Sequence, residues 1–396
     1  MNNFRLTKRR ITTLHIPPLG RLRTSSLKGK RPSIVRYGVV GLGHIAQIAV
    51  LPAFNHARQN SRLVALFSDD KAKLRELGRR YRVPHLASYK EYDTLLKRGE
   101  IDAVYIALPN SMHRDFTVQA AEAGVHVLCE KPLALSEPDC QEMIAACKRN
   151  RVKLMTAYRL HFEKSNLEAV KLARSGKLGD LRYFNSIFSM QAREPNIRLD
   201  RKMGGGPLWD LGVYCINAAR YLFAEEPLEV FAMTAAGSDK RFRDVEEMVA
   251  ATLRFPGERL ANFICSFGAA DAGTYQLVGT KGRVTLDNAY EYVEPVEMQI
   301  TIGDRKQART FATRDQFAPE LIYFSNCILQ DKQPEPSGEE GRADVRIIEA
   351  LYKSAEIRKP VNLTPLSKTK RPSLRQAIRR RPVPKPELIH AHSGSR

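Results

Sequence analysis

The sequence predicts an α/β fold: a doubly wound parallel sheet comes first, and an α+β domain with one large, mostly antiparallel open sheet follows. Three observations predict it. Short β-branched runs alternate with helical periodicity up to residue 158, extended runs dominate after residue 181, and a glycine-rich turn joins the first strand to the first helix. The chain has 396 residues, which is enough for about two domains of ~100–200 residues each.

The first predicted strand, residues 34–40, runs directly into a Gly-Leu-Gly-His-Ile-Ala turn at residues 41–46, after which helical periodicity begins. Strand, glycine turn and helix in this order are typical of dinucleotide-binding sites. Gly41 allows the tight turn, Gly43 lets a pyrophosphate approach the backbone, and Ala46 lets helix and strand pack closely. The start of the helix supplies unpaired N–H groups for the phosphates.

The alternation of strand and helix continues along the next hundred residues. It predicts strands at 63–67, 103–108, 126–129 and 153–157, and helices at 72–81, 112–123 and 137–148. Repeated βα units of this length predict a Rossmann-type parallel sheet with right-handed crossovers.

The end of the second strand bears on the choice of cofactor. A carboxylate about 20 residues beyond the glycines would bind the 2′-hydroxyl of NAD and would repel the 2′-phosphate of NADP. Here the strand ends at Ser68, and Lys73 follows near a helix start, which suits a phosphate. Asp69 and Asp70 come directly after Ser68, so NAD stays open as the alternative. We expect NADP.

Ligands of open α/β sheets bind outside the carboxyl ends of the strands, so the segments after each strand are where a site is expected. Two such segments stand out. Residues 109–113, Pro-Asn-Ser-Met-His, follow the strand at 103–108, and Glu130-Lys131-Pro132 follows the strand at 126–129. A solvated charge pair is the alternative interpretation of Glu130 and Lys131.

A second group of candidates follows three glycines at 204–206. Asp210 and Tyr214 are four residues apart and share one face of the helix predicted from Pro207 to residue 223. Taken alone, they fit a helix-dipole acid and a core aromatic. Together with Lys131 they fit an alcohol dehydrogenation, in which one group must move the hydroxyl proton while hydride moves to or from a nicotinamide. A nearby ammonium favours the phenolate that such a role needs.

These motifs together resemble the Gfo/Idh/MocA oxidoreductases and, within them, the glucose–fructose oxidoreductase subgroup. The resemblance covers about residues 35–363. It rests on the glycine turn, Ala-Val-Tyr-Ile-Ala-Leu-Pro-Asn at 103–110, Glu-Lys-Pro at 130–132, Ala-Tyr-Arg at 157–159, the triple glycine with Asp210-x-Gly212-x-Tyr214, and the stretch from Pro336 to Arg346.

The resemblance implies an NADP-dependent oxidoreductase that acts on a sugar or polyol. It implies that Lys131 orients the substrate hydroxyl and touches the nicotinamide ribose, that Asp210 binds sugar hydroxyls, and that Tyr214 donates or accepts the proton. These three are the expected catalytic residues. The expected substrate contacts are Lys131, Tyr158, Arg198, Asp210 and Tyr214, and no metal is expected.

The cofactor contacts that we expect combine the spacing argument with the resemblance. The subgroup's pattern for NADP maps onto Ser68, Lys73 and Tyr81, whereas His44 replaces the lysine that is usual in the subgroup. The full set is Gly41, Gly43, His44, Ile45, Ser68, Lys73, Tyr81, Leu108, Pro109, Asn110, His113, Glu130, Lys131 and Arg159. Alternatives are a sugar dehydrogenase or 1,5-anhydrofructose-type reductase with a dissociable cofactor, and a non-catalytic nucleotide-sensing regulator.

The second domain is expected to be one large, mostly antiparallel sheet. The runs that predict its strands are 181–191, 229–235, 248–255, 260–267, 275–278, 283–286 and 296–302. The helix from Pro207 covers one face, and the resemblance implies that the open face forms the interface of a homo-oligomer, a dimer or tetramer. A late helix at 343–357 is expected to pack back on the nucleotide domain.

The net charge of +21 is concentrated at the two ends of the chain. Residues 1–36 contain ten Lys or Arg and no acidic residue, and residues 367–396 contain nine against Glu387. Because the middle is nearly neutral, no nucleic-acid partner is expected. We expect a basic arm at 1–33 that is disordered or docks on a subunit, a cofactor domain at 34–158, a substrate and oligomerisation domain at 159–365, and a disordered tail at 366–396.

The cysteines and the start of the chain bear on the compartment. Six cysteines are spread without CxxC pairing, which fits a reducing cytoplasm. Arg9-Arg10 resembles the start of a twin-arginine export signal, but the segment that follows is short and broken by prolines, so periplasmic export is the disfavoured alternative. No run approaches ~18 consecutive apolar residues, so no membrane span is expected.

Overall fold

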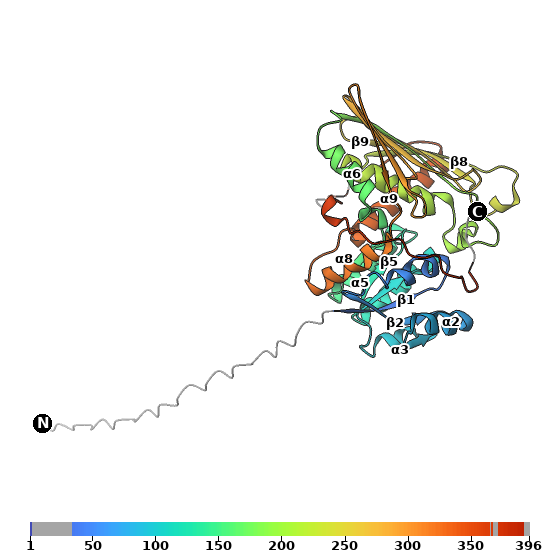
Figure 1. The fold of residues 1–396 in the computed structure, drawn as a ribbon, viewed down its shortest axis with the longest axis vertical. Coiled ribbons are helices and arrows are strands. Elements are labelled where there is room, and N and C mark those ends of the chain that lie inside the picture. Colours follow the sequence, from blue (N-terminus) through green and yellow to red (C-terminus); the bar gives the residue numbers. More distant parts are fainter. Residues whose placement is uncertain (2–33, 365, 367–370, 392–396) are drawn as a thin grey trace. The chain divides into compact units, whose positions relative to one another are not determined.

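The computed structural model of the chain describes residue 1 and residues 34–364, 366 and 371–391 (Figure 1). The basic arm expected at 1–33 therefore lies almost entirely outside the described residues. Four residues within the expected tail, 367–370, and its last five, 392–396, also lie outside the described residues. Residues 34–364, 366 and 371–391 belong to one compact unit.

The first half of this unit is a six-stranded sheet, sheet A, in which every pairing is parallel and the strand order is β3-β2-β1-β4-β5-β6. Its strands are β1 (Val35–Val40), β2 (Ser61–Phe67), β3 (His85–Ala87), β4 (Ala103–Ile106), β5 (His126–Cys129) and β6 (Leu154–Thr156). The central strands are buried on both faces, which explains their continuous apolar sequences. The predicted doubly wound sheet is confirmed.

The helices of this half connect the parallel strands. They are η1 (Ala46–Val50), a wide helical turn that continues into α1 (Leu51–Ala53), then α2 (Lys71–Tyr81), α3 (Tyr92–Leu96), α4 (His113–Glu122) and α5 (Glu137–Arg149). Side chains cap two of them, because Asp70 accepts from the first N–H groups of α2 and Ser136 does so for α5.

The second half is a nine-stranded sheet, sheet B, in the order β14-β13-β12-β11-β7-β10-β9-β8-β15. Among its pairings only that of β10 with β7 is parallel. Its strands are β7 (Leu181–Ser189), β8 (Glu229–Ala235), β9 (Met248–Phe255), β10 (Arg259–Ser266), β11 (Ala272–Gly279), β12 (Gly282–Asp287), β13 (Val296–Ile302), β14 (Arg305–Phe311) and β15 (Val361–Asn362). The predicted large, mostly antiparallel open sheet is confirmed.

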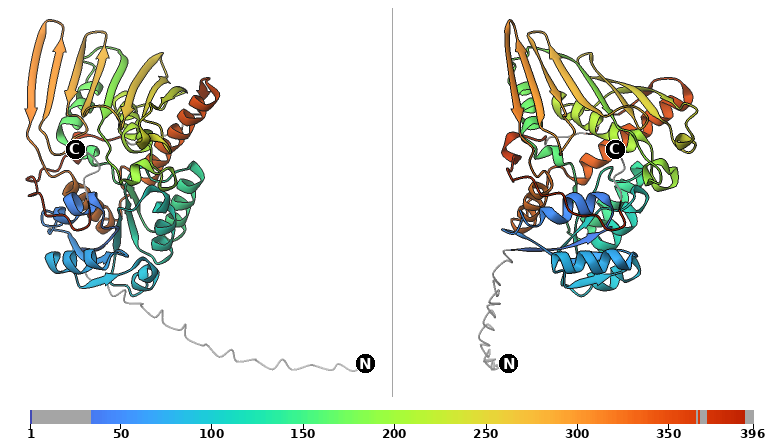
Figure 2. Two further views of the ribbon diagram at one scale, coloured as in Figure 1. Left: turned by 90° about the vertical axis from the view of Figure 1, so that its right-hand side faces the viewer. Right: turned by 45° about the vertical axis from the view of Figure 1, so that its right-hand side comes forward.

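Helices cover one face of sheet B, below the strands in Figure 1. They are α6 (Lys164–Arg174), α7 (Val213–Phe223), which continues η7 (Leu208–Gly212), and α9 (Gly338–Ile357). Helix α9 also packs against α5 and β6, so it joins the two halves. Helix α8 (Phe317–Leu329) packs on sheet A beside α1, and Figure 2 shows the two halves from two further sides.

A buried charged network ties the helices under sheet B together. Arg220 of α7 is fully buried and pairs with Glu226, Glu340 and Asp344. The pKa of Arg220 is raised, because these carboxylates outweigh the burial that opposes its charge. Removing one partner of such a network leaves an uncompensated buried charge, so the network fixes how α7 packs on α9.

Several elements were not predicted from the sequence, namely β3, α3, α6, α8, β14 and β15. Helices α6 and α8 are additional, and α8 is apolar on nearly every side because it is buried, so it lacks the one-sided periodicity by which helices are found. Strand β14 is also additional. It lies at the edge of sheet B with exposed, mostly polar side chains, and therefore lacks alternation.

The expected disordered tail is a further correction. Residues 371–391 have defined positions on the body, where they form the dark red segment of Figures 1 and 2. Arg371 pairs with the buried Glu226 at 2.7 Å, and the side chain of Gln376 donates to the backbone oxygen of Glu335 at 2.7 Å. The basic residues of this segment thus find acceptors on the body, which the composition alone does not reveal.

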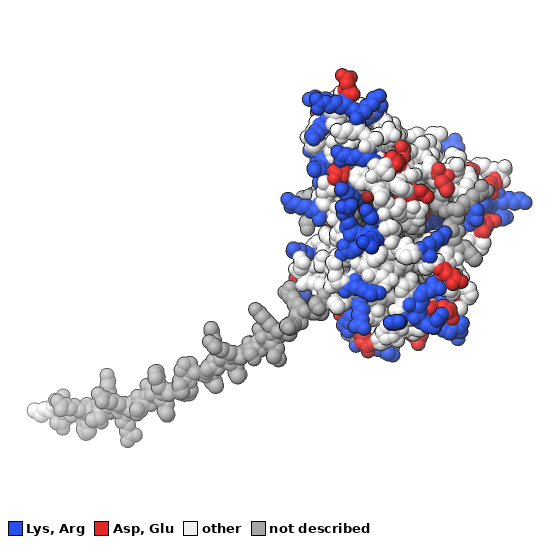
Figure 3. Space-filling view, in the orientation of Figure 1, with Lys and Arg blue, Asp and Glu red and all other residues white. Residues whose placement is uncertain are grey.

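The surface of the described body carries both signs of charge. On the face seen in Figure 3, basic and acidic side chains are interspersed. Within the described ranges, no helix is both long and apolar enough to cross a membrane.

Candidate active site

The glycine turn after β1 forms an open cradle. Gly41 has a φ of +91°, and a Cβ there would lie 2.4 Å from the backbone oxygen of Ala107, so only glycine fits. At Gly43 a Cβ would meet nothing within 4 Å, which leaves free space in front of the backbone. Ala46 is fully buried where helix and strand meet. The geometry therefore fits a dinucleotide whose pyrophosphate lies against Gly43 and the helix start at His44 and Ile45.

The loop after β2 presents Ser68 and Lys73 near this cradle. Ser68 directly follows the strand, and its hydroxyl accepts a hydrogen bond from the backbone N–H of Asp70 at 3.1 Å. Both neighbouring carboxylates are already engaged: Asp70 caps α2 by accepting from Ala72 and Lys73, and Asp69 accepts from the N–H of Tyr89 at 3.0 Å. This arrangement fits the 2′-phosphate of NADP better than the 2′-hydroxyl of NAD.

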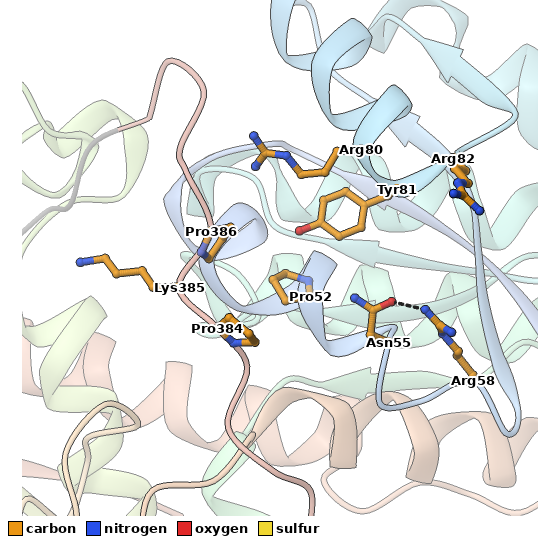
Figure 4. A pocket seen from close by; sticks show the side chains of 9 residues that line it. All are labelled: Pro52, Asn55, Arg58, Arg80, Tyr81, Arg82, Pro384, Lys385 and Pro386. Atoms are coloured by element: carbon orange, nitrogen blue, oxygen red, sulfur yellow. Dashed lines mark hydrogen bonds between the residues drawn. The ribbon is translucent and has the colours of Figure 1, made fainter.

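Two tyrosines near this loop have different surroundings. Tyr89 interacts with Ser68 through its hydroxyl, and burial raises the pKa of Tyr89. The predicted contact Tyr81 instead lines a pocket with Pro52 and Arg80 at the far end of α2 (Figure 4). Tyr89 is thus the tyrosine that the structure brings to the cofactor loop, because the turn after β3 carries the chain back to Ser68. That Tyr81 contacts the cofactor stays a prediction.

The segment after β4 holds the two halves of the site together. Asn110 donates from its side-chain amide to the backbone oxygen of Gly204 at 2.8 Å. Leu108 lies beside the glycine turn, since a Cβ at Gly41 would be 3.1 Å from its side chain, and Pro109 precedes the short helix η3 (Asn110–Met112). His113 is fully buried, with its two ring nitrogens 2.9 Å and 3.0 Å from the backbone oxygens of Pro132 and Leu108. Burial lowers the pKa of His113.

His113 was expected to touch the cofactor, and the structure assigns it a different place. Because both ring nitrogens face carbonyl oxygens inside the protein, His113 joins the loop after β4 to the loop after β5. It positions the site without being exposed to a ligand. The position of His113 four residues beyond Pro109 could not predict this buried role, because its partner Pro132 comes from the next βα unit.

The loop after β5 carries Glu130 and Lys131. Glu130 accepts a hydrogen bond from the hydroxyl of Tyr105 at 2.6 Å, and burial raises its pKa. Lys131 is 11% exposed at its side chain and donates from Nζ to Asp210 Oδ1 at 2.9 Å and to the Asp210 backbone oxygen at 3.0 Å. The interpretation of Glu130 and Lys131 as a merely solvated pair is therefore wrong.

Asp210 lies between two cations. Its Oδ1 faces Lys131, and its Oδ2 accepts from Arg198 Nε at 2.5 Å. Burial works against the charge of this carboxylate, but Arg198 and Lys131 outweigh it and hold the pKa of Asp210 well below its usual range. Burial likewise opposes the charge on Lys131, and Asp210 more than compensates, so that the pKa of Lys131 is raised. All three groups are charged at neutral pH.

Tyr214, one helical turn after Asp210, lies beside two cations. Lys131 Nζ lies 4.6 Å from the centre of its ring, and the Arg159 guanidinium carbon lies 5.1 Å from it. Phe188 packs edge-on against the same ring, with 5.5 Å between the two ring centres. The structure thus brings the three predicted catalytic residues, Lys131, Asp210 and Tyr214, into one cluster.

The triple glycine explains how Arg198 reaches Asp210. A Cβ at Gly205 would lie 2.5 Å from the backbone oxygen of Arg198, and one at Gly204 would lie 2.8 Å from the Cβ of Asn110. Only residues without side chains allow the chain before η7 to pass this closely to both segments. The glycines therefore set the position of the Arg198 loop against the loop after β4.

Arg159 and Tyr158 of the 157–159 motif lie in different surroundings, and only Arg159 lies beside the catalytic cluster. Arg159 is buried and bonds to the side chain of Gln316 and the backbone oxygen of Tyr290, beside Tyr214. Tyr158, expected to contact substrate, is 3% exposed and donates to Asp344 at 2.5 Å. Tyr158 belongs to the buried charged network instead. The sequence around Tyr158 could not reveal this, because its partner Asp344 lies far along the chain.

Tyr292 is a residue of the cluster that was not predicted, whereas His44 was expected as a cofactor contact. Tyr292 lies 5.2 Å from the Arg159 guanidinium carbon, measured to the ring centre, and comes from the loop after β12. His44 is influenced by both Arg198 and Lys385, which after burial are the causes that lower its pKa. Tyr292 has no motif around it, so no signal in the sequence could have found it.

The family of the chain follows from comparison with known proteins. The model of the Gfo/Idh/MocA oxidoreductase family, NAD-binding Rossmann fold, matches residues 35–158, and the model of the Gfo/Idh/MocA C-terminal domain matches residues 166–285. The chain belongs to the Gfo/Idh/MocA oxidoreductase family, as its motifs predicted.

Individual relatives have stated activities. D-xylose 1-dehydrogenase (NADP(+)) 2 of Haloferax volcanii is 30% identical, and the match covers 83% of this chain and 99% of the relative. The crystal structure of aldose-aldose oxidoreductase from Caulobacter crescentus, complexed with glycerol, is 38% identical with a TM-score of 0.80, and covers 83% of this chain and 100% of that one. A 3-ketoreductase from Actinomadura kijaniata in complex with NADP and TDP-benzene is 25% identical with a TM-score of 0.74, over 81% of this chain and 98% of that one.

Proposed function

We propose that the protein is an NADP-dependent oxidoreductase that transfers hydride between the nicotinamide and a sugar, at the anomeric carbon of an aldose. The observation that carries this proposal is the cluster of Lys131, Asp210 and Tyr214 at the carboxyl edge of sheet A, where the glycine turn also lies. The activities of the xylose dehydrogenase and of the aldose-aldose oxidoreductase support the substrate class.

Each residue of the cluster has its own role in the proposed reaction. NADP, when bound, supplies the nicotinamide carbon that exchanges hydride with the substrate. The Lys131 ammonium has three N–H groups, of which two are held by Asp210, so one is left to donate to a sugar oxygen. Asp210 fixes the ammonium in place, and Arg198 fixes Asp210. Tyr214 takes the hydroxyl proton during oxidation of the sugar and returns it during reduction.

The charges of the cluster favour this proton transfer. Lys131 and Arg159 lie on the ring of Tyr214, and both stay protonated at neutral pH. During oxidation of the sugar, these cations stabilise the phenolate that takes the proton and the negative charge that develops on the sugar oxygen as its proton leaves. A regulator that only binds nucleotide needs no such arrangement, which is why we prefer the enzyme.

NADP is the proposed cofactor. Ser68 and Lys73 are placed to bind the 2′-phosphate, and Asp69 and Asp70 are held by backbone N–H groups. The relatives that use or bind NADP support this choice.

We also propose a homodimer through the open face of sheet B. There β7 and β10 run side by side, with Tyr183 opposite Leu260 and Ile187 opposite Ile264. These four apolar side chains are exposed, so they form a patch that association would cover. A reducing compartment such as the cytoplasm is supported by six cysteines that are all buried and are spread without CxxC pairing.

The proposed function is tested by initial rates of absorbance change at 340 nm with a panel of pentoses and hexoses and either NADP or NAD. We expect turnover with at least one aldose, with NADP preferred. The variant Lys131→Met should lose at least about 99% of that rate, whereas Lys177→Met, a change of an exposed lysine in the turn before β7, should keep it. Absence of turnover with every aldose, or equal rates for the two variants, would contradict the proposal.

A further inference from the structure

The last part of the described chain lies against the elements that form the cofactor site. We propose that residues 384–390, here called the C-terminal strap, are a part of this site that holds the adenosine half of NADP in place. This inference rests on the proposed function, because it concerns how the same cofactor is retained. It is argued from contacts at three points along the strap.

The first contact joins the strap to the helix that follows the glycine turn. Gln47 is 1% exposed and begins the second turn after Gly43. Its side-chain amide donates to the backbone oxygen of Ile389 at 2.8 Å and accepts from the backbone N–H of Ile389 at 2.7 Å. It also donates to the backbone oxygen of Leu42 at 2.9 Å. One buried side chain therefore links the phosphate-binding turn directly to the strap.

The second contact joins the strap to the loop after β2. His390 Nδ1 lies 2.9 Å from Asp70 Oδ2, and the other oxygen of Asp70 caps α2. Asp70 and its neighbour Asp69 are the carboxylates beside Ser68 that could repel a 2′-phosphate. Lys73 Nζ lies 4.0 Å from the same Oδ2 of Asp70, so His390 and Lys73 together engage this oxygen. The pair thus favours NADP over NAD at this loop.

The third contact lies at the far end of α2. Arg80 donates to the backbone oxygen of Glu387 at 2.6 Å. Figure 4 shows Pro384 and Pro386 facing Pro52 and Tyr81 across the pocket that they line. Prolines stiffen an extended segment and lower the entropy lost when it is held in one position.

These contacts place the strap beside the path of the cofactor. A dinucleotide in this fold runs from the glycine turn to the loop after β2. The strap is anchored at Gln47, which follows the glycine turn, and at Asp70, which lies in the loop after β2. Lys385 adds a positive charge that is felt at His44, next to the cradle. The strap therefore adds contacts and a cation along the adenosine half, which slows dissociation of the cofactor.

The match to the aldose-aldose oxidoreductase covers all of that chain but 83% of this one. The family models end at residue 285. The contacts of the strap thus come from a segment beyond the matched family domains.

The test compares a chain that ends at residue 383 with a control chain that ends at Ala391 and keeps the strap. The shorter chain retains the anchors Arg371–Glu226 and Gln376–Glu335, so the body should fold as before. After removal of bound nucleotide, NADPH binding and release are followed by fluorescence in the absence of sugar. We expect the dissociation constant and the release rate of NADPH to rise at least about tenfold without the strap, which corresponds to about 1.4 kcal/mol.

Two further measurements sharpen the result. His390→Ala should lower the preference for NADPH over NADH about threefold or more, whereas Arg379→Ala, a change outside the strap, should not. Thermal melting of the two chains should give the same midpoint, because the anchors at Arg371 and Gln376 are kept.

The outcomes separate this inference from the proposed function. Equal NADPH binding by the two chains, or tighter binding without the strap, would refute the strap as a cofactor contact and leave the oxidoreductase intact. No binding of NADPH by either chain would refute the proposed function and, with it, this inference.

Discussion

Replacing Tyr214 by Phe is the change that isolates the proposed proton transfer. The substitution removes one oxygen and keeps the ring, and the contacts seen for this residue are mainly ring contacts, to Lys131 at 4.6 Å and to Phe188 at 5.5 Å. The hydroxyl interacts with Arg159, which keeps its bonds to Gln316 and Tyr290. We therefore expect the free energy of unfolding to change by less than about 1 kcal/mol.

The effect on the reaction should be much larger. General acid–base catalysis by one positioned side chain contributes about 10²–10⁴-fold, so Tyr214→Phe should lower kcat for aldose oxidation by that factor, or about 2.7–5.5 kcal/mol in activation free energy. Absorbance at 340 nm gives kcat, fluorescence gives the NADPH dissociation constant, and thermal melting gives stability. The last two should stay close to those of the wild type.

The matched control is Tyr183→Phe, which removes the same oxygen on the open face of sheet B, where Tyr183 is 38% exposed. This variant should keep full activity. A kcat within about threefold of the wild type for Tyr214→Phe would refute the assignment of proton transfer to this residue, because so small a loss corresponds to less than ~1 kcal/mol.

Three further predictions concern cofactor choice, pH and association. Lys73→Gln should weaken NADPH binding about tenfold or more and leave NADH binding unchanged, as measured by fluorescence, since it removes a cation from the 2′-phosphate site; equal losses for both nucleotides would contradict this. Burial lowers the pKa of His126 from 6.5 to about 4 in the folded protein. Between these two pH values the unfolded chain therefore binds more protons than the folded one, so the free energy of unfolding falls as the pH drops from about 6.5 toward 4. Each pH unit in this window costs up to about 1.4 kcal/mol at this site, and His126→Asn should show a flatter decline in urea unfolding; an identical decline would exclude His126 as a source. Ile264→Glu should weaken the proposed dimer at least about tenfold in light scattering because it buries an unpaired charge, whereas Ile357→Glu at the end of α9 should not, and a dimer unaffected by Ile264→Glu would rule out the open face.

Short-range motifs in the sequence were enough to predict the centre of the site. Each motif of the centre can be recognised from residues that are close together in the sequence. These motifs are the glycine turn, Glu130-Lys131 and the pair Asp210 and Tyr214. Parallel strands bring their carboxyl ends to one edge, so the segments after β4 and β5 had to lie together. The fold class followed for the same reason, since the period of the apolar residues differs between strands and helices.

What the sequence could not reveal depends on partners that are distant in the chain. Tyr158 lies next to Arg159 in sequence, yet its hydroxyl is bound by Asp344 of α9. His113 is held by Pro132 of the next unit. The tail shows the same limit. Its composition is that of a disordered segment, and partners far along the chain, among them Glu226, Gln47 and Asp70, give its described residues a defined position.

The central claim is that hydride passes between the carbon of a sugar hydroxyl group and the nicotinamide, and an isotope experiment tests it most directly. The purified protein is given NADP and an aldose that carries deuterium at its anomeric carbon, and the NADPH formed is analysed by mass spectrometry. The account predicts NADPH that is heavier by one deuterium, with formation abolished in Lys131→Met. Unlabelled NADPH, or none from any aldose, would contradict it.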